Sequence, residues 1–489
     1  MPAYLGKYVL ALLVLIVFDV QAAVFCVSSG NALGDAMITS RTNGEHDEIR
    51  VITGTHTSNL HAPQSPQFFH QIAGNTDLDK NLTISGGWSA GDTCATQVSL
   101  NPSATVLDAL YFGPVFSIQL GNGAGTPYVG TFTLRNLTLN RGKGFSAGQV
   151  TGIEVFGFLA PPGSVVLDNL HVVNGTSAVS IGNAVSINLG GSGSVRFRNS
   201  IVSLNSLTGS SSEPVLIRQL DNVTAYVSNN SIFANSGTNT ASGLRIIGSA
   251  ATVSNNAVAD NTSTANPSYQ FYSDQPTALT LVKNHFGTKG FANGAPFSET
   301  DTTTGNAFWA GLGVEMIPLE GSPLRDSGNN TPTGGALTID FRGNPRVINT
   351  IIDRGASEAP VPDVAGKGPI VIDNTPVKGS TTWLQGEPGQ SAFGEITFIS
   401  SGGGIGGLTS IDCGVTSGTV LIGAFPSQYV ATGYSAEPVL VGFDNLSQTV
   451  QTGVILCTFQ RGGVVGSTSA TYTFKGGVET LLKNGFETP

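Results

Sequence analysis

A short run of β-type residues, an asparagine and a second β-type run recur six times between Thr131 and Gly287. The asparagines of these six phrases are Asn136, Asn169, Asn199, Asn230, Asn256 and Asn284. By subtraction of their numbers, successive asparagines are 33, 30, 31, 26 and 28 residues apart. A loosely fixed period of this size indicates stacked repeats, because each unit is too small to bury its own apolar side. The pattern predicts a parallel β-helix with one repeat per coil.

The residues around each asparagine alternate, and this alternation predicts which side chains face the core. Successive side chains of a strand point to opposite faces, so the positions two and four residues before each asparagine should point inward. These positions hold Phe132 and Leu134, Val165 and Leu167, Val195 and Phe197, Tyr226 and Ser228, Thr252 and Ser254, and Thr280 and Val282.

The recurring asparagines have a physical explanation in a β-helix. Equivalent residues of neighbouring coils lie about 4.8 Å apart, and an asparagine amide carries both a donor and an acceptor. Stacked amides can therefore form one continuous hydrogen-bonded column. Asparagine also tolerates the left-handed backbone of a sharp corner. We expect the six asparagines to form one ladder at a corner, and a second set to mark the next corner: Asn140, Asn174, Asn205, Asn235 and Asn261.

The position before each ladder asparagine is often charged. Arg135, Asp168, Arg198 and Lys283 occupy it, and all four are expected to point outward. One interpretation is a solvated column of weak ion pairs, each worth about 0–1 kcal/mol. The other is a ligand strip that grips an acidic polymer.

Composition agrees with an all-β chain and excludes some partners. Glycine accounts for 64 of the 489 residues, and charged residues make up 11%, against a usual ~25%. This composition is typical of many short strands joined by tight turns. The net charge is −10 and there is no Lys/Arg cluster, which argues against nucleic acid and anionic membranes as partners.

The first 22 residues predict export. Lys7 supplies a positive start, and the apolar run from Val9 to Phe18 is too short to span a membrane. Val20, Gln21 and Ala22 fit a cleavage site, so the mature chain is expected to begin at Ala23. No later stretch is long enough to span a membrane.

The four cysteines predict two disulfides, because exported proteins meet an oxidising environment. Cys26 and Cys94 lie near the start of the chain, whereas Cys413 and Cys457 lie near its end. We expect pairing within each end.

Two sets of motifs resemble a known family. Phe25-Cys26-Val27, Asn43 to Arg50, Gly54-Thr55-His56, Leu82 to Trp88 and Thr105 to Asp108 look like the opening coils of secreted bacterial right-handed parallel β-helix proteins of the pectate-lyase-like superfamily. Ser322-Pro323, Asp326-Ser327-Gly328, Asp340 to Arg346 and Asp353 to Glu358 resemble the closing segment of the "choice-of-anchor Q" group of these proteins. Gly485-Phe486-Glu487 resembles tails on secreted proteins of Gram-negative bacteria. The resemblance implies an extracellular or cell-surface protein.

A change of pattern after residue 358 divides the chain. We expect a signal peptide over 1–22, a β-helix over 23–358, a Pro-rich linker over 359–369, a small β-sandwich over 370–476 and a tail over 477–489. The sandwich is predicted from about seven strand-like runs separated by Gly-rich turns. Cys413 and Cys457 could bridge its two sheets.

Catalytic motifs are hard to find. The closest acidic cluster, Glu45, Asp47 and Glu48, is better explained as a polar turn than as a Ca²⁺ site. The Asn-Thr-Asp, Gly-His-Gly and Arg-Ile-Lys segments of polygalacturonase-type hydrolases do not occur. His171 occupies a slot that we match to Ile201, Ile232, Val258 and Phe286, and it is interpreted as a semi-buried histidine rather than a base.

Two functions remain open. The first is a non-catalytic extracellular β-helix that binds a surface or environmental polysaccharide, or another cell-surface component, or acts in adhesion. It needs no cofactor. The alternative is a divergent polysaccharide lyase or glycoside hydrolase acting on an acidic polysaccharide, for which Ca²⁺ would be a candidate cofactor. Acids meeting a base in one groove, such as Glu154, Asp168 or Asp221 with Arg198, Arg218 or Arg245, would favour the enzyme.

Overall fold

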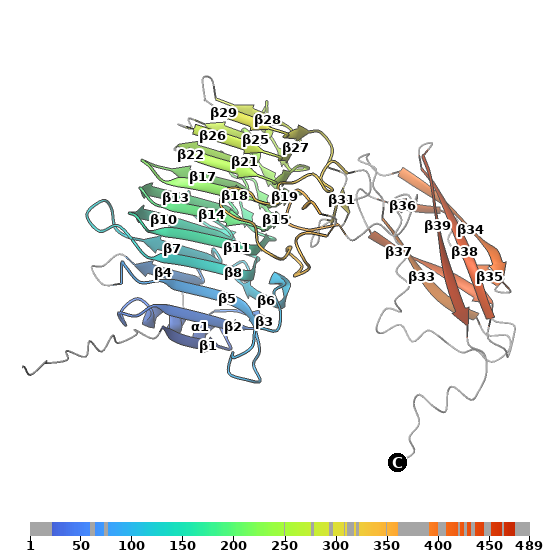
Figure 1. The fold of residues 1–489 in the computed structure, drawn as a ribbon, viewed down its shortest axis with the longest axis horizontal. Coiled ribbons are helices and arrows are strands. Elements are labelled where there is room, and N and C mark those ends of the chain that lie inside the picture. The colour runs from blue at the N-terminus through green and yellow to red at the C-terminus, as the bar shows by residue number, and fades with distance from the viewer. Residues whose placement is uncertain are drawn as a thin grey trace, which may run out of the picture.

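A computed structural model of the chain describes residues 22–359, apart from gaps at 59–63, 73–76, 249, 275–277, 293–296, 308, 311–316, 319–321 and 349, and the backbone of strands between 391 and 474. The predicted fold class is confirmed. Parallel strands wind into a β-helix whose coils stack from β1 at one end to β28 and β29 at the other (Figure 1). The predicted signal peptide, all of the linker after Ala359 and the tail lie outside the described residues.

Each coil contributes up to four short strands. Two of them belong to sheet A, which has 17 strands in the described part of the chain and two rows separated by a corner. The first row contains β1 (Ala23–Val27), β2 (Asp47–Ile52), β5 (Leu82–Trp88), β8 (Thr131–Asn140), β11 (Ser164–Val173), β14 (Ser194–Arg198), β18 (Thr224–Ser228), β22 (Ala250–Ser254), β26 (Ala278–Val282) and β29 (Phe297–Thr300). The second row contains β3 (Gly54–His56), β6 (Thr105–Asp108), β15 (Ile201–Ser203), β19 (Ser231–Phe233), β23 (Ala257–Val258), β27 (His285–Phe286) and β30 (Thr303–Thr304), and the long strands β8 and β11 cross the corner into it.

Two further parallel sheets complete the coils. Sheet C contains β9 (Lys143–Gly144), β12 (Thr176–Ser177), β16 (Ser206–Leu207), β20 (Ser236–Gly237) and β24 (Thr262–Ser263). Sheet B contains β4 (Phe68–Ile72), β7 (Phe116–Leu120), β10 (Ile153–Leu159), β13 (Val185–Gly191), β17 (Val215–Gln219), β21 (Ala241–Gly248), β25 (Tyr269–Asp274) and β28 (Lys289–Phe291). A short 3-10 helix, η1 (Pro102–Ala104), and the antiparallel pair β31 (Trp309–Ala310) and β32 (Ile317–Pro318) lie outside these sheets.

A helix that the sequence analysis missed closes the first end of the β-helix. Helix α1 (Gly30–Thr39) begins after Ser29, whose hydroxyl accepts a hydrogen bond from the Ala32 amide at 3.1 Å. Leu33 and Met37 of this helix are fully buried in the main core. Repeat proteins need such a cap, because the first coil has no neighbour below it to cover its apolar side.

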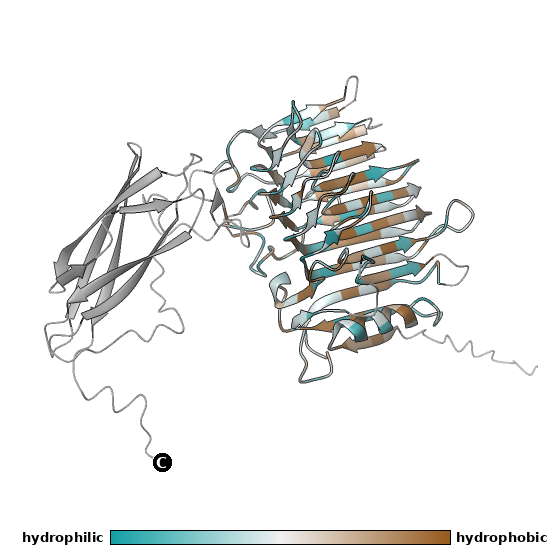
Figure 2. Ribbon diagram, turned by 180° about the vertical axis from the view of Figure 1, so that it is seen from behind, coloured by the Kyte–Doolittle hydropathy of each residue, from teal (hydrophilic) through white to brown (hydrophobic). Residues whose placement is uncertain are grey.

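Apolar side chains from the inner faces of sheets A, B and C fill the inside of the coils. The alternation of apolar and polar residues along the strands is visible in Figure 2. The predicted inward positions are correct for Phe132 to Phe197, but wrong for the next three coils. There the residues of the main core are Ala225 and Val227, Ala251 and Val253, and Leu279 and Leu281, whereas Tyr226, Thr252 and Thr280 are half-buried on the outer face.

The error has one cause, which is a one-residue slip in matching the asparagines. Strand pairing places Ser231 opposite Ile201, so Asn199 is matched by Asn229 and not by Asn230. The residues with left-handed backbone at this corner are Asn136, Asn169, Asn199, Asn229, Asn255 and Lys283, with φ between 51° and 57°. Asn-Asn doublets concealed the register in two of these coils, and in the third the corner residue is Lys283, which precedes Asn284.

Residues 322–359, hereafter the closing segment, run along the outside of the second row of sheet A (Figure 1). The Gly355 amide donates to the Asn255 carbonyl at 2.6 Å, and the Ala356 amide donates to Ser231 Oγ at 2.9 Å. Phe341 and Ala356 pack with Ile201 of the second row in a small apolar cluster that is separate from the main core. The closing segment therefore covers this row with a core of its own.

The strands after residue 390 form two antiparallel sheets. One contains β33 (Ser391–Ile399), β37 (Ala436–Asp444) and β35 (Leu421–Ala424), and the other contains β36 (Gln428–Ala431), β34 (Gly407–Gly418), β38 (Gln451–Arg461) and β39 (Val464–Phe474). Cys413 and Cys457 are directly opposite each other on β34 and β38. The suggestion that they bridge two sheets is therefore wrong, because they belong to neighbouring strands of one sheet.

Candidate binding face

The predicted ligand strip is not an open surface. Asp168 and Arg198 face each other across one rung, with Arg198 Nε 2.8 Å from Oδ1 and Nη2 2.6 Å from Oδ2. Arg198 Nη1 also donates to the Gly334 carbonyl of the closing segment at 2.9 Å. The side chain of Arg198 is only 14% exposed, and that of Asp168 only 9%. The pair is thus largely desolvated rather than a solvated surface pair.

The other two strip residues do not extend a continuous charged surface. Lys283 is at the corner and donates from Nζ to the Gly328 carbonyl at 3.2 Å, so it too contacts the closing segment. Arg135 lies one rung below Asp168 and is half-buried. The side chains that were expected to grip a polymer instead contact the closing segment at two of the four positions.

The six predicted ladder asparagines form two columns on opposite sides of the sheet. On the outer side, the amides of Asn136 and Asn169 and those of Asn169 and Asn199 lie 3.0 Å apart. On the inner side, Asn230 Nδ2 donates to Asn256 Oδ1 and Asn256 Nδ2 donates to Asn284 Oδ1, each at 3.0 Å. No side-chain bond joins the two columns between Asn199 and Asn230, so the prediction of one inward column was wrong.

The inner column replaces leucine in the core. Leu137 and Leu170 occupy the equivalent place in the earlier coils. In this column both polar atoms of the Asn256 side chain have hydrogen-bond partners, since Nδ2 also donates to the carbonyls of Val227 and Ser254 at 2.8 and 3.0 Å. Buried amides are tolerated when every polar atom has a partner. Both columns are therefore structural, and neither is available to a ligand.

A second ladder stands at the next corner, and it contains three of the five asparagines expected there. Asn140 and Asn174 bond each other at 3.0 Å instead, because Gly175, and not Asn174, is matched to Asn205. Asn205 Nδ2 donates to Asn235 Oδ1, and Asn235 Nδ2 donates to Asn261 Oδ1, both at 2.8 Å. All three side chains are buried. This corner is likewise a structural element of the coil.

The histidine and the acidic cluster singled out in the sequence are engaged within the fold. His171 is 4% exposed, and burial lowers its pKa to about 4. It faces outward under the closing segment, opposite Ile201, and not in the slot of Ile232 and Phe286. Glu48 pairs with Arg50 at 2.7 Å, and Asp47 accepts a hydrogen bond from Asn43 at 2.7 Å. Asp47 and Glu48 lie on strand β2 rather than in the polar turn that was expected, and these acids do not converge on one point.

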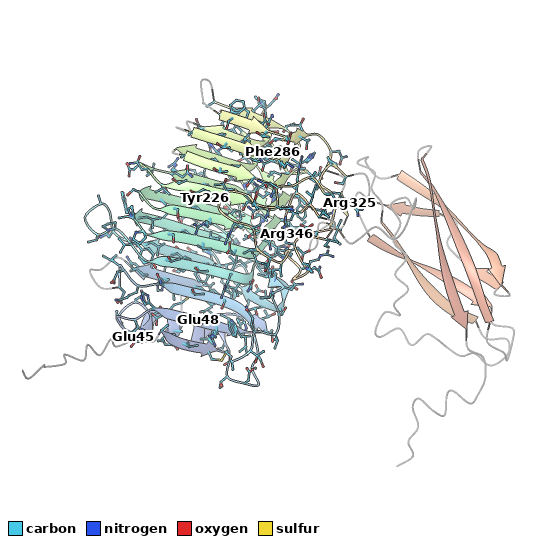
Figure 3. All side chains as sticks on the ribbon, in the orientation of Figure 1. Glu45, Glu48, Tyr226, Phe286, Arg325 and Arg346 are labelled. Atoms are coloured by element: carbon cyan, nitrogen blue, oxygen red, sulfur yellow. A yellow bond between two sulfur atoms is a disulfide. The ribbon has the colours of Figure 1, made fainter. Side chains whose placement is uncertain are left out.

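The motif residues of the closing segment form a buried charged cluster. Arg346 Nε lies 3.2 Å from Glu358 Oε1, and its guanidinium also donates to the Ala356 carbonyl at 2.8 Å. Asp340 accepts the Glu358 amide at 3.1 Å, and Asp353 accepts the Ala359 amide at 2.6 Å. Burial raises the pKa of Glu358 to about 8 despite Arg346. Figure 3 shows Arg346 on the side of the closing segment, remote from Glu45 and Glu48 in the first coils.

The outer face of sheet B is built differently, from two columns of side chains in register. The first column runs from Ser117 through Glu154, Ser186, Leu216 and Arg245 to Tyr272. The second runs from Gln119 through Phe156, Asn188, Arg218 and Ile247 to Asp274. Asn188 and Arg218 are exposed at the middle of the second column, and neither makes a hydrogen bond or ion pair with another described residue. Their donors are therefore free to meet a ligand.

Two aromatic rings lie beside these free donors. Phe156 and Phe158 occupy alternate outward positions of β10, and both are half-exposed. The Phe158 ring lies over Gly190, where an added Cβ would come within 2.8 Å of the ring. A larger residue at 190 would displace the ring, so the glycine allows Phe158 to lie flat across the neighbouring strand.

Acids and an arginine also converge on this face. Arg245 bridges two carboxylates, with Nη1 3.2 Å from Glu213 Oε1 and Nη2 2.9 Å from Asp274 Oδ2. Asn239 donates to the other oxygen of Glu213 at 2.7 Å. Burial raises the pKa of Glu213, although the amide and the positive charges of Arg245 and Arg218 act in the opposite direction.

The sequence identifies Glu154, Arg218 and Arg245 as candidates, but it does not place them on one face with Asn188, Phe156 and Phe158. A usable signal existed, since Arg218 and Arg245 alternate with the apolar inward residues of their strands. A third acid, Glu154, lies further down the first column. Its pKa is raised by burial, and its Oε2 accepts a hydrogen bond from Ser117 at 3.2 Å. The face combines aromatic rings, free amide and guanidinium donors and carboxylates, which are the groups that recognise sugar rings, hydroxyls and acidic substituents.

Comparison of the chain with protein-family models, with curated proteins and with solved structures finds no match. Among the described residues, no helix is long and apolar enough to cross a membrane. In the same residues, His, Cys, Asp and Glu side chains do not gather in groups of three or more at which a metal ion could be held.

Proposed function

We propose that this protein is an extracellular β-helix, exported by a Gram-negative bacterium, that binds a polysaccharide of its surface or surroundings without catalysis, through the outer face of sheet B. The observation that carries the proposal is the exposed, unpaired Arg218 and Asn188 beside Phe156 and Phe158. Flat aromatic rings accept the apolar face of a sugar ring, while amide and guanidinium groups hydrogen-bond its oxygens. Strand neighbours repeat about every 4.8 Å, so the face offers a chain molecule several contacts in succession.

The motifs in the first coils and in the closing segment support the extracellular assignment by their resemblance to secreted β-helix proteins of the pectate-lyase-like superfamily and its choice-of-anchor Q group. The Cys26–Cys94 disulfide agrees with an oxidising compartment. Export is supported by the charged start and short apolar run of residues 1–22.

A second candidate function is cleavage of an acidic polysaccharide. Asp168 and Arg198 meet, as expected for an enzyme, but they pair with each other under the closing segment. One further observation favours cleavage. Glu213, Arg245 and Asp274 bring two carboxylates and a guanidinium together on the same face. Both acids are held by the same guanidinium, however, so neither is free to take or give a proton without breaking an ion pair. Binding without cleavage therefore explains the geometry better.

A glycan array probed with the exported protein tests the proposal. We expect a set of related polysaccharides to bind, and the Arg218→Ala/Asn188→Ala variant to lose that binding while keeping its fold. Bound glycans incubated with the wild-type protein and then sized by chromatography should remain intact. Shortened products would favour the enzyme, whereas the absence of any glycan binding would contradict both functions.

A further inference from the structure

The closing segment buries two imidazoles of the second row of sheet A. His171 is 4% exposed, and its ring lies edge-on to Phe341 with 5.6 Å between ring centroids. Its Nε2 is 3.3 Å from Ser203 Oγ. Phe341 belongs to the closing segment, so this imidazole is covered by the segment and not by the coils alone.

The second imidazole, that of His285, is fully buried. Its Nδ1 is 2.9 Å from Thr303 Oγ1, and its Nε2 is 3.1 Å from the Gly305 carbonyl. The guanidinium of Arg354, from the closing segment, donates to the carbonyl of the preceding residue, Asn284, at 3.0 Å and to the same Thr303 hydroxyl. A proton added to His285 would therefore place a second positive charge beside Arg354.

Few apolar contacts hold the closing segment on the coils, and most of the remaining contacts are hydrogen bonds such as those of Gly355, Ala356 and Arg354. Leu324, Phe341 and Ala356 pack in the small cluster over the second row, and no residue of the segment belongs to the main core as described. We call the contact between the closing segment and the second row of sheet A the seam. Some polar groups there are left unsatisfied as well: both amide atoms of Asn229 and the hydroxyls of Ser254 and Ser357 are buried without a partner among the described residues. Local openings are expected where few apolar contacts hold an element.

We propose that the closing segment is a pH-sensitive strap, which protonation of His171 and His285 releases from the second row of sheet A, uncovering the Asp168–Arg198 pair beneath it. Burial lowers the pKa of each imidazole to about 4, against about 6.5 for a free histidine. Histidines with a lowered pKa disfavour protonation while the segment is docked on the coils. The free energy that holds the segment in place is therefore complete above pH ~6.5 and is lost as the pH falls towards ~4. This inference does not depend on which polysaccharide the protein binds.

The charged groups around the imidazoles do not offset this effect. Arg354 faces His285 and disfavours its protonation. The negative charge of Asp301, in the next coil, raises the pKa of Arg354 and so favours its charged form. Beside His171, Asp340 and Arg342 flank Phe341 in sequence and are paired with each other at 3.3 Å. Thr138, Ile201 and Ser203 of the neighbouring strands carry no charge.

The buried charged cluster of Arg346 and Glu358 inside the segment changes its contribution to stability with pH in the opposite direction to the histidines. The pKa of Glu358 is raised to about 8, so this carboxyl takes up a proton as the pH falls and its contribution to stability is retained at low pH. The strap should therefore detach as a folded unit, in which the contacts of Arg346 with the rest of the segment persist.

Amide hydrogen exchange of the full chain, read by mass spectrometry at pH 7.5 and pH 5.0 and corrected for intrinsic rates, tests the proposal. At pH 5.0 each imidazole is 1.5 units below its free pKa, so exchange at the seam should rise about 30-fold if one histidine acts and about 1,000-fold if both act. Peptides of sheet B, such as β13 (Val185–Gly191), should keep their protection. An unchanged seam, or a rise shared equally by all the coils, would overturn the proposal.

Variants then assign the effect to the imidazoles. His171→Gln/His285→Gln keeps hydrogen-bonding side chains but removes the titration, and should leave the seam equally protected at both pH values. Each single variant should remove part of the response, which keeps the test decisive if the double variant fails to fold. A seam that still opens at pH 5.0 without either histidine would show that other groups control it.

Discussion

Arg198 forms two hydrogen bonds to the carboxylate of Asp168 from the next rung of the β-helix, at 2.8 and 2.6 Å, and a third to the closing segment. This relationship explains why the charged strip is not a binding surface. The two charges neutralise each other, and Gly334 covers the arginine.

Asp168→Asn should lower the free energy of unfolding by about 2–4 kcal/mol, because it leaves the charge of Arg198 poorly solvated and unpaired. The expected cost exceeds the 0–1 kcal/mol of a solvated pair. Glu48→Gln is the matched control, since the Glu48–Arg50 pair is more exposed, at 24% and 23%, and its loss should cost less than about 1 kcal/mol. Urea unfolding measures both. Equal losses would mean that Asp168 is as well solvated as Glu48.

Asn256 should be among the residues least tolerant of change. Its amide bonds Asn230, Asn284 and two carbonyls inside the core. Asn256→Leu strands these groups at about 1–3 kcal/mol each, so we expect a loss of at least about 3 kcal/mol. Asn188→Leu makes the same change at an exposed, unbonded position and should cost less than about 0.5 kcal/mol. Comparable urea midpoints for the two variants would refute the structural role of the inner column.

Asp47 should make stability depend on pH near neutrality. Burial raises its pKa from 3.8 to about 6, more than the hydrogen bond from Asn43 lowers it. Because the folded pKa is the higher one, the contribution is present in full below pH ~3.8 and is lost as the pH rises through ~6. Asp47→Asn should therefore stabilise the protein by about 1–2 kcal/mol at pH 7.5 and by nearly nothing at pH 4. Thermal unfolding at the two values checks this, and a destabilised variant at pH 7.5 would show that the ionised carboxylate is favoured.

The disulfide prediction is confirmed for Cys26–Cys94, which closes a separation of 68 residues. Cys94→Ser should cost about 4 kcal/mol by the loop-entropy argument. Cys413 and Cys457 are opposite each other, at a Cα separation of about 4.5–5.5 Å for such positions, which a disulfide can span. Non-reducing peptide mapping should recover a Cys413–Cys457 peptide. A peptide joining Cys94 to Cys413 would contradict both pairings.

The sequence predicts the repeat well because two periodicities agree within each coil. Strand alternation and recurrent asparagine are both local signals, and together they identified the parallel β-helix and its corners. They failed where the signals conflict. In the coils of Asn229–Asn230 and Asn255–Asn256 the second asparagine was matched, although Ala225 and Val227 or Ala251 and Val253 give the correct register. Apolar alternation is the stronger guide, since it follows burial directly.

Contacts between distant segments could not be predicted in this way. Nothing near Arg198 in the sequence indicates that Gly334, 136 residues later, will cover it. Likewise Glu213, Arg245 and Asp274 come from successive coils and meet only after the coils have stacked. Helix α1 was missed for a different reason, because a single ten-residue helix has no repeat to reveal it.

One affinity comparison tests most directly whether the outer face of sheet B binds a polysaccharide. Titration calorimetry with a polysaccharide identified on the array should be run for the wild-type protein, Arg218→Ala and Arg196→Ala. Arg196 is a matched arginine on the first row of sheet A, where its guanidinium lies 5.9 Å from the Tyr226 ring centroid. We predict that Arg218→Ala weakens binding at least about tenfold, the loss of about 1.4 kcal/mol, while Arg196→Ala binds as the wild type does. Unchanged binding by Arg218→Ala together with lost binding by Arg196→Ala would place the site on another face and contradict the account.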